Sequence, residues 1–297
     1  DYIHSLYHMG NTYELLQEFD KAIEFHSKAM QKARQCKEFD TLDLADLHGS
    51  AARAYEGKGN YKKAIYYYEV CLDLIEKARG TDNFYYMMNM LTLASACEKA
   101  NLLNQAVEYC EKAVDIRRKL FSENHLDFMN SLNSLAAICC KANQFDKAIE
   151  IHREVLELVE KMLSKEHTFY ADALNNLSVD YAGKKEYKKA LALNVKALNQ
   201  KKALLGEKDQ QVAVCLMSLG NLYEKMEKED EALRCYQEAL EIRKAEESAR
   251  INCADAYTAM GKLFEKQKKY TEASLHVQEA LKMRKECGDS ESGMYIW

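Results

Sequence analysis

Histidine side chains are the first place where this sequence could hold a metal ion. His4 and His8 stand four residues apart, so on a helix both rings lie on one face, as in a chelating pair. The sequence supplies neither a third ligand nor the glutamate of an H-E-x-x-H motif beside them. We therefore interpret the two histidines as polar surface of a first helix, and the sequence predicts no metal site.

Cysteine and histidine together could supply a nucleophile and its general base. Cys139, Cys140 and His152 are the residues that suggest this chemistry. Nothing in the sequence orients them, and it contains no glycine-rich oxyanion loop, phosphate-binding loop or G-x-S-x-G elbow. The repeat pattern described below already accounts for Cys139 and His152 as packing residues. The sequence thus predicts no catalytic residue and no cofactor, and we expect that the protein is not an enzyme.

The composition favours a helical protein without nucleic-acid or membrane partners. The 297 residues are 47% hydrophobic and 30% charged, a balance typical of globular chains. Zero prolines and eleven glycines are too few turn formers for an all-β fold. The net charge of −5 comes without a local basic patch, so neither nucleic acid nor an anionic membrane is an expected partner.

Ten cysteines are spread over the predicted helices. The sequence has no C-x-x-C pair and no zinc-ligand spacing. Ten free thiols in a reducing compartment are the simplest interpretation, and we expect a cytoplasmic location.

An alanine recurs at a nearly constant interval along the whole chain. It stands at Ala22, Ala64, Ala106, Ala148, Ala190, Ala232 and Ala273, at intervals of 42 residues with a final one of 41. Twelve residues before each alanine is a small residue: Gly10, Ala52, Ala94, Ala136, Ser178, Gly220 and Gly261. Two registers at one period indicate seven internal repeats.

Each repeat is predicted to be a helical hairpin. In the sixth repeat Leu216, Leu219, Gly220 and Tyr223 form one apolar stripe at helical spacing, and a second stripe follows a polar turn. A single hairpin cannot bury both stripes, so the hairpins must stack. The predicted fold is all-α, an α-solenoid superhelix of about fourteen helices. Its repeats cover about 1–40, 41–82, 83–124, 125–166, 167–208, 209–249 and 250–286, and 287–297 are a tail or the start of a further helix.

The motifs resemble those of a known repeat family. The stretches L-M-S-L-G-N-L-Y and E-A-L-R-C-Y-Q-E-A-L of the sixth repeat are similar to the tetratricopeptide repeat. The 42-residue period and Leu174-Asn175-Asn176-Leu177 resemble the longer-helix subtype of kinesin light chains. The resemblance implies a protein-protein interaction module that binds a peptide or partner segment along a concave surface formed by the first helix of each repeat.

This resemblance points to a candidate groove. With the small residue as position 8, positions 2, 5, 9 and 12 of each first helix lie on the opposite stripe. Asparagine recurs there, and its amide both donates to and accepts from a peptide backbone. The candidate residues are Asn130, Asn133, Asn175 and Asn221 for the backbone, Met88, Leu91, Val214 and Met217 as apolar anchors, and Asp172.

The charge on these positions indicates the kind of peptide. Eight of the groove positions are acidic and two are basic. The acids are Glu14, Asp46, Glu56, Glu98, Asp172, Glu224, Asp255 and Glu265, and the bases are Arg53 and Lys262. Lysines at the neighbouring position 13 (Lys99, Lys141, Lys225 and Lys266) reduce the resulting −6 to −2 if they lean inward. We expect a neutral or basic extended peptide.

Two other functions remain open. Repeats of this type are often joined to catalytic domains, so the chain is alternatively a regulatory region of a larger multidomain enzyme or signalling protein. It is also alternatively a scaffold that self-associates through its uncapped ends. A clamp for a chaperone's C-terminal carboxylate is disfavoured, since Asn11 has no matching set of lysines.

Overall fold

The computed structural model describes residues 2–36, 38–121, 126–245 and 250–287. These residues form fourteen α-helices and no β-strand. Their contacts divide the chain into two compact units, Asp1–Gln144 and Phe145–Trp297.

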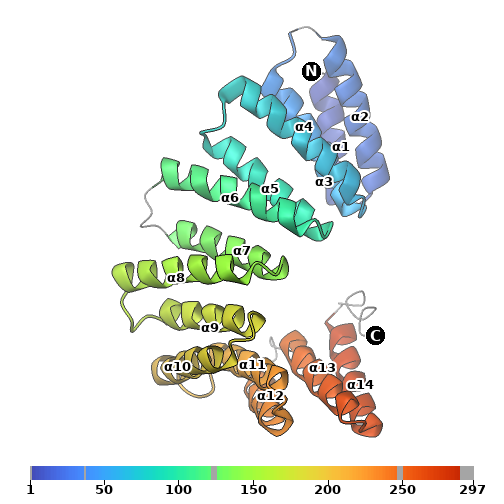
Figure 1. Ribbon diagram of the computed structural model, residues 1–297. Helices are drawn as coiled ribbons and strands as arrows, with labels where there is room; N and C mark the ends of the chain where they lie inside the picture. Colours follow the sequence, from blue (N-terminus) through green and yellow to red (C-terminus); the bar gives the residue numbers. More distant parts are fainter. Residues whose placement is uncertain (1, 37, 122–125, 246–249, 288–297) are drawn as a thin grey trace. The chain divides into compact units, whose positions relative to one another are not determined.

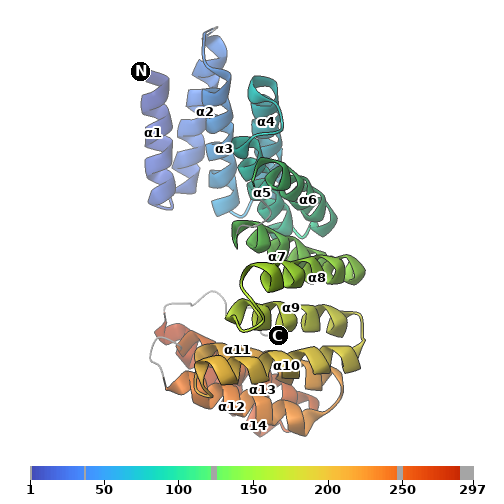
Figure 2. The same cartoon turned by 90° about the vertical axis from the view of Figure 1, so that its left-hand side faces the viewer.

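The N-terminal unit contains seven helices (Figures 1 and 2). They are α1 (Tyr2–Leu15), α2 (Phe19–Gln35), α3 (Thr41–Gly57), α4 (Tyr61–Arg79), α5 (Phe84–Lys99), α6 (Leu103–Leu120) and α7 (Leu126–Lys141). Helices α1 and α2, α3 and α4, and α5 and α6 pack as hairpins. Each second helix also packs on the first helix of the next hairpin, which makes the unit a stack.

The C-terminal unit repeats this arrangement. Its helices are α8 (Phe145–Met162), α9 (Thr168–Gly183), α10 (Tyr187–Leu205), α11 (Gln210–Lys225), α12 (Glu229–Lys244), α13 (Arg250–Lys266) and α14 (Tyr270–Glu286). Helices α9 to α14 form three hairpins, and α8 packs on α9. The boundary between the two units therefore falls inside the fourth repeat, in the turn between α7 and α8.

The predicted all-α solenoid of seven helical hairpins is confirmed. Its hydrophobic core is divided into clusters between neighbouring hairpins. Met30 of α2 and Leu47 of α3 share one cluster, and Leu240 of α12 and Met260 of α13 share another. Residues 288–297, which belong to the predicted tail or further helix, lie outside the described residues.

The small residue at position 8 lets the two helices of a hairpin approach closely, as predicted. A Cβ added at Gly10 would lie 2.4 Å from the ring of His26, and one added at Gly220 would lie 2.4 Å from the ring of Tyr236. The recurrent alanine of the second helix is fully buried in six repeats, and Ala273 of the last one is 8% exposed. Any larger residue at these positions would force the helices apart.

All seven first helices end in the same turn, a feature that the sequence did not reveal. The residue seven places after the small one has a positive φ in every repeat: Gln17, Gly59, Asn101, Asn143, Lys185, Glu227 and Lys268. The next amide then bonds back to the carbonyl five residues earlier, as from Asn60 to Tyr55 and from Lys228 to Tyr223. This is a Schellman-type ending, which satisfies carbonyls that the helix leaves unpaired.

The cysteines are free and mostly buried. Cys97, Cys110 and Cys139 lie in the core, which agrees with the interpretation of Cys139 as a packing residue. Cys36 and Cys287 are exposed because each directly follows the last residue of a helix, α2 or α14.

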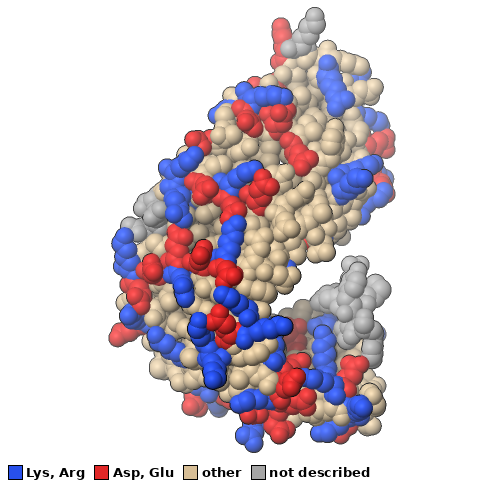
Figure 3. Space-filling view, viewed as in Figure 1, with Lys and Arg blue, Asp and Glu red and all other residues tan. Residues whose placement is uncertain are grey.

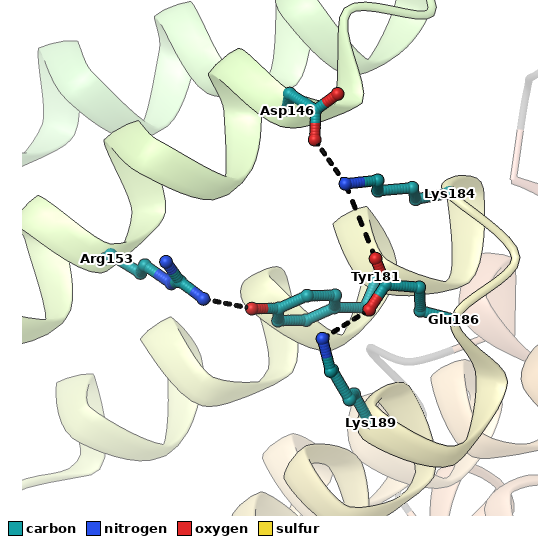
Figure 4. Close-up of polar contacts among 6 residues, drawn as sticks. All are labelled: Asp146, Arg153, Tyr181, Lys184, Glu186 and Lys189. Carbon is teal, nitrogen blue, oxygen red and sulfur yellow. Dashed lines mark hydrogen bonds and ion pairs between the residues drawn. The ribbon is translucent and has the colours of Figure 1, made fainter.

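Polar contacts also join successive hairpins (Figure 4). In the C-terminal unit, Arg153 of α8 donates from Nη2 to the hydroxyl of Tyr181 at 2.5 Å, and the Nζ of Lys189 lies 5.2 Å from the centre of the same ring. Lys184 extends from the end of α9 to Asp146 of α8, with 2.5 Å between nitrogen and oxygen. The ring of Tyr181 is thereby held between α8 and α10.

Candidate functional site

In each unit one pair of neighbouring first helices is in clear contact, α1 with α3 and α9 with α11. Positions 2, 5, 9 and 12 of the first helices are the candidate groove.

In the N-terminal unit the predicted residues are accessible to different degrees. Met88 of α5 is 40% exposed and Leu91, one turn further, is half-buried. On α7, Asn130 is exposed and Asn133 is half-buried. The Oδ1 atom of Asn133 is buried and has no hydrogen-bond partner among the described residues. Exposed and half-buried apolar and amide groups thus lie on the first helices, as a peptide-binding surface requires.

In the C-terminal unit, Val214 and Met217 supply the apolar groups. Val214 is 48% exposed, whereas Met217 is half-buried and packs against the core on both sides of α11. Asp172 in the first half of α9 is half-buried, and its carboxylate forms an ion pair with Lys201, with 2.5 Å between Oδ1 and Nζ. Because Lys201 is only 2% exposed, this ion pair is part of the hairpin's own structure.

The two asparagines of the C-terminal unit have different surroundings. Asn175 is 9% exposed, and its Oδ1 accepts a hydrogen bond from Nδ2 of Asn194 at 3.0 Å. Asn221 is exposed, and its Oδ1 accepts from the hydroxyl of Tyr236 at 2.7 Å. Asn221 therefore presents an oriented amide on the surface, while the oxygen of Asn175 is already used inside the fifth repeat.

A cavity of about 330 Å³ lies on this surface between α9 and α11. It is lined by Ser178, Val179, Ala182, Ser218, Asn221, Leu222, Glu224 and Lys225. Four of these residues are at predicted groove positions, namely Val179, Ala182, Asn221 and Glu224. Sequence reasoning missed Ser218 and took Ser178 only as a packing residue. The cavity combines hydroxyl, amide, carboxylate and ammonium groups with an apolar floor, the chemistry of a site that orients a peptide.

The predicted acidity of the groove positions is largely balanced by pairing. The carboxylate of Glu14 accepts a hydrogen bond from Nε of Arg53, with 3.0 Å between nitrogen and oxygen. The carboxylate of Glu56 accepts one from Nζ of Lys99 at 2.7 Å, and Glu98 forms an ion pair with Lys141. Position 13 thus contributes Lys99 and Lys141 to the surface, as the sequence suggested. Figure 3 shows basic and acidic side chains beside one another over the N-terminal unit.

A tyrosine of the second helix reaches the first-helix surface in two repeats. The hydroxyl of Tyr68 donates to Glu56 at 2.8 Å, and the single hydroxyl proton of Tyr236 is shared between Asn221 and Oε2 of Glu224, which lies 3.0 Å from the phenol oxygen. Burial, followed by the nearby carboxylate, raises the pKa of both phenols above the ordinary value. The phenols therefore stay protonated and donate at neutral pH, which orients the acceptor groups of the groove.

The histidines that suggested other chemistry have structural surroundings. His152 is buried, and its Nδ1 lies 2.5 Å from Oδ2 of Asp180, which connects α8 to α9. His4 lies 3.7 Å from the carboxylate of Asp43. In the part of the chain that the structure describes, no three His, Cys, Asp or Glu side chains gather around a point that could hold a metal ion. Over the same residues, no helix combines the length and the apolar character needed to span a bilayer.

The family model of the tetratricopeptide repeat matches residues 1–77, 86–161, 169–245 and 216–286. The chain belongs to the tetratricopeptide repeat family. Repeats of this family mediate protein-protein interactions. No curated protein matches the chain significantly.

Solved tetratricopeptide repeat structures share the fold. A kinesin light chain-like protein from Podosopora anserina with nearly identical repeats is 20% identical, with a TM-score of 0.57 over 68% of this chain and 96% of that one. BtubC from P. vanneervenii is 22% identical, with a TM-score of 0.54 over 76% and 91%. A repeat protein from Parabacteroides merdae is 13% identical, with a TM-score of 0.64 over 99% and 98%. At these identities the similarity concerns the fold.

Proposed function

We propose that this tetratricopeptide repeat protein is a non-enzymatic interaction module that binds an extended peptide on its first helices. The observation that carries the proposal is the cavity between α9 and α11, where Asn221 is exposed and already oriented by Tyr236. Because Oδ1 of Asn221 accepts from Tyr236, its Nδ2 can donate to a peptide carbonyl. Such contacts hold a backbone with little dependence on sequence.

The apolar anchors and the charge define the ligand further. Val214, beside the cavity on α11, and Met88 on α5 expose enough apolar surface to hold a side chain of the peptide. Among the described residues Glu224 and the exposed Glu265 have no ion-pair partner, whereas Lys99 and Lys141 are already paired with Glu56 and Glu98, so a strongly acidic peptide gains little. A neutral or basic peptide is the proposed ligand, and a reducing compartment such as the cytoplasm suits the free thiols.

A peptide array tests this function. The full chain is screened on an array of random peptides, and the peptides it captures are titrated against Asn221→Ala and Asn133→Ala. We expect each variant to lose binding by on the order of tenfold, the effect of one lost hydrogen bond to a partly buried group. Asn199→Ala, at an exposed asparagine of the second helix α10, is the matched control. Capture of no peptide, or selection of strongly acidic ones, would contradict the proposal.

A regulatory role in a larger protein is the second candidate. A signal transduction ATPase from Pyrococcus horikoshii carries a tetratricopeptide repeat sensor, and this chain aligns with 44% of it at 15% identity and a TM-score of 0.60. In such an arrangement the same surface would bind a ligand or a catalytic domain. Self-association through the ends of the stack is the remaining alternative, and the solution mass over a concentration series tests it.

A further inference from the structure

A ladder of ion pairs connects the first helices of neighbouring repeats. Glu56 at position 12 of the second repeat pairs with Lys99 at position 13 of the third, and Glu98 pairs in the same way with Lys141. Both pairs have an offset of 43 residues. The ladder therefore follows the repeat register from the second to the fourth repeat, within the N-terminal unit.

The ladder is interrupted in the C-terminal unit. Lys225 is at position 13 of the sixth repeat, and the residue with the same offset is Ala182. An alanine thus stands where the first three repeats have Glu14, Glu56 and Glu98 and the fourth has Cys140. Among the described residues no carboxylate lies within 4.0 Å of the Lys225 ammonium.

The next ion pair of the ladder, between the sixth and seventh repeats, is missing as well. Glu224 is at position 12 of the sixth repeat, and the lysine in register with it, Lys266, instead lies 3.7 Å from Glu229. No cation of the described residues pairs with Glu224, whose Oε2 accepts the Tyr236 hydroxyl at 3.0 Å. The half-buried carboxylate is held in place by this bond but is not neutralised.

The unpaired charges of Glu224 and Lys225 and the alanine that replaces a glutamate at position 182 lie at the same cavity. Ala182, Glu224 and Lys225 all line the cavity of about 330 Å³ between α9 and α11. A glutamate at position 182 would extend into this space, so the shorter alanine leaves part of it open. A ligand in the cavity would find the exposed ammonium group of Lys225 beside the half-buried carboxylate of Glu224, and an ion pair with a half-buried carboxylate gains more than one on an open surface.

We propose that this cavity binds two oppositely charged side chains of a peptide, with a carboxylate on Lys225 and an ammonium or guanidinium group on Glu224. The proposal rests on the proposed peptide-binding function and names its specificity. In an extended peptide, side chains separated by one residue point to the same side, about 7 Å apart. The preferred segment therefore has an acidic and a basic residue at i and i+2, which keeps the peptide neutral overall.

Four sets of defined peptides test the specificity. Acetylated decapeptides of Ser, Asn and Ala carry Glu and Lys, Gln and Lys, Glu and Gln, or two Gln residues at i and i+2, and are titrated calorimetrically against the full chain. We expect the Glu and Lys set to bind tighter than either singly charged set by on the order of tenfold. Equal binding by all four sets overturns the inference and leaves the peptide-binding function standing, because the backbone contacts alone would then explain it. No binding by any set, from protein that captures peptides on the array, overturns the inference too.

Matched variants locate the effect in the cavity. Ala182→Glu restores the ladder partner of Lys225 and fills the space, so it should abolish the preference for the charged pair. Asn176→Glu adds the same charge to α9 at a half-buried residue that does not line the cavity, and should leave the preference unchanged. Lys225→Met should remove only the gain from the peptide glutamate, and Glu224→Gln only the gain from the lysine. These two variants keep the test valid if Ala182→Glu fails to fold, and an unchanged preference in both refutes the proposal.

Discussion

The hydroxyl of Tyr236 on α12 donates a hydrogen bond to Oδ1 of Asn221 on α11, with 2.7 Å between the oxygens. The same hydroxyl lies 3.0 Å from Oε2 of Glu224. The Tyr236 ring is completely buried against Gly220, so the hydroxyl cannot move away. One buried phenol of the second helix therefore orients two polar groups on the first-helix surface.

Removing this hydroxyl should affect binding more than stability. In Tyr236→Phe, Asn221 and Glu224 lose their orienting donor, so we expect peptide affinity to fall several-fold and the free energy of unfolding to fall by about 1 kcal/mol. Calorimetric titration and urea denaturation measure the two effects. Tyr223→Phe, in the same repeat, is the control because the Tyr223 hydroxyl makes no hydrogen bond within the described part of the chain. Full affinity in Tyr236→Phe would contradict the orienting role.

The left-handed turns offer sites for stabilisation. Lys185 and Glu227 have φ of 65° and 60°, a region in which a side chain costs about 1 kcal/mol and glycine does not. Lys185→Gly and Glu227→Gly should each raise the free energy of unfolding by up to about 1 kcal/mol, measured by chemical denaturation. Gly59→Ala, at φ of 76°, should lower it by a similar amount. A stabilising Gly59→Ala would show that the turn does not require this conformation.

His26 should make the protein sensitive to acid. Burial, and secondarily the charge of Arg53, lowers its pKa from the ordinary 6.5 to about 4, and neither ring nitrogen has a hydrogen-bond partner among the described residues. Between pH 6.5 and 4 the unfolded chain binds more protons than the folded one, so stability falls as the pH falls through this window. The loss attributable to His26 is on the order of 2 to 3 kcal/mol.

The change in pH dependence is checked with His26→Tyr. Tyrosine already fills the corresponding position opposite glycine in the sixth repeat, where Tyr236 packs on Gly220. Urea denaturation at a series of pH values should show a smaller loss of stability below pH 6.5 in this variant. An identical pH profile in both proteins would assign the acid sensitivity to other groups.

Overpacking one hairpin should unfold it locally. Ala190 is fully buried, and its carbonyl accepts a hydrogen bond from the Ser178 hydroxyl at 2.8 Å. Ala190→Leu should force α9 and α10 apart at a cost of roughly 1–3 kcal/mol. Because each hairpin contacts mainly its neighbours, hydrogen exchange should rise first in the fifth repeat. Ala192→Leu, at an exposed residue of the same helix, is the control.

Thiol reactivity should separate the cysteines into two groups. Cys36 and Cys287 are exposed, whereas burial raises the pKa of Cys71 and Cys110 to about 12. At pH 8 the buried thiols stay protonated and shielded, so the native protein should react rapidly at the two exposed residues. Ten thiols should react in denaturant, and a smaller number without reductant would indicate disulfides.

The sequence predicted the fold because its signals are repeated seven times. A small residue and an alanine at fixed spacing dictate a close helical hairpin, and the structure packs Gly10 and Gly220 directly against rings of the second helix. The turn was harder to foresee. Among the seven left-handed residues Gly59, Asn101 and Asn143 are of types that favour such a conformation, and the other four adopt it because the helix ending requires it.

The groove positions were predicted by helical spacing, which gives a face of the helix but not the contacts made there. Asn175 at position 5 of the fifth repeat and Asn221 at position 9 of the sixth were assigned to the same stripe, yet one is buried and the other exposed. The difference arises from the second helix, where Asn194 reaches Asn175 and Tyr236 reaches Asn221. The pairing of the acids likewise depends on side chains of the next repeat, which a single-helix pattern does not contain.

The common turn after every first helix bears on how such a protein changes over evolutionary time. Its backbone hydrogen bond is the same whether the left-handed residue is Gln17, Asn101 or Glu227, so the side chain there can vary at a cost of about 1 kcal/mol without changing the geometry of the hairpin. Repeats can diverge at this point while their helices keep the same spacing. The turn is therefore a natural junction for chimeras, in which a second helix from one repeat is joined to a first helix from another.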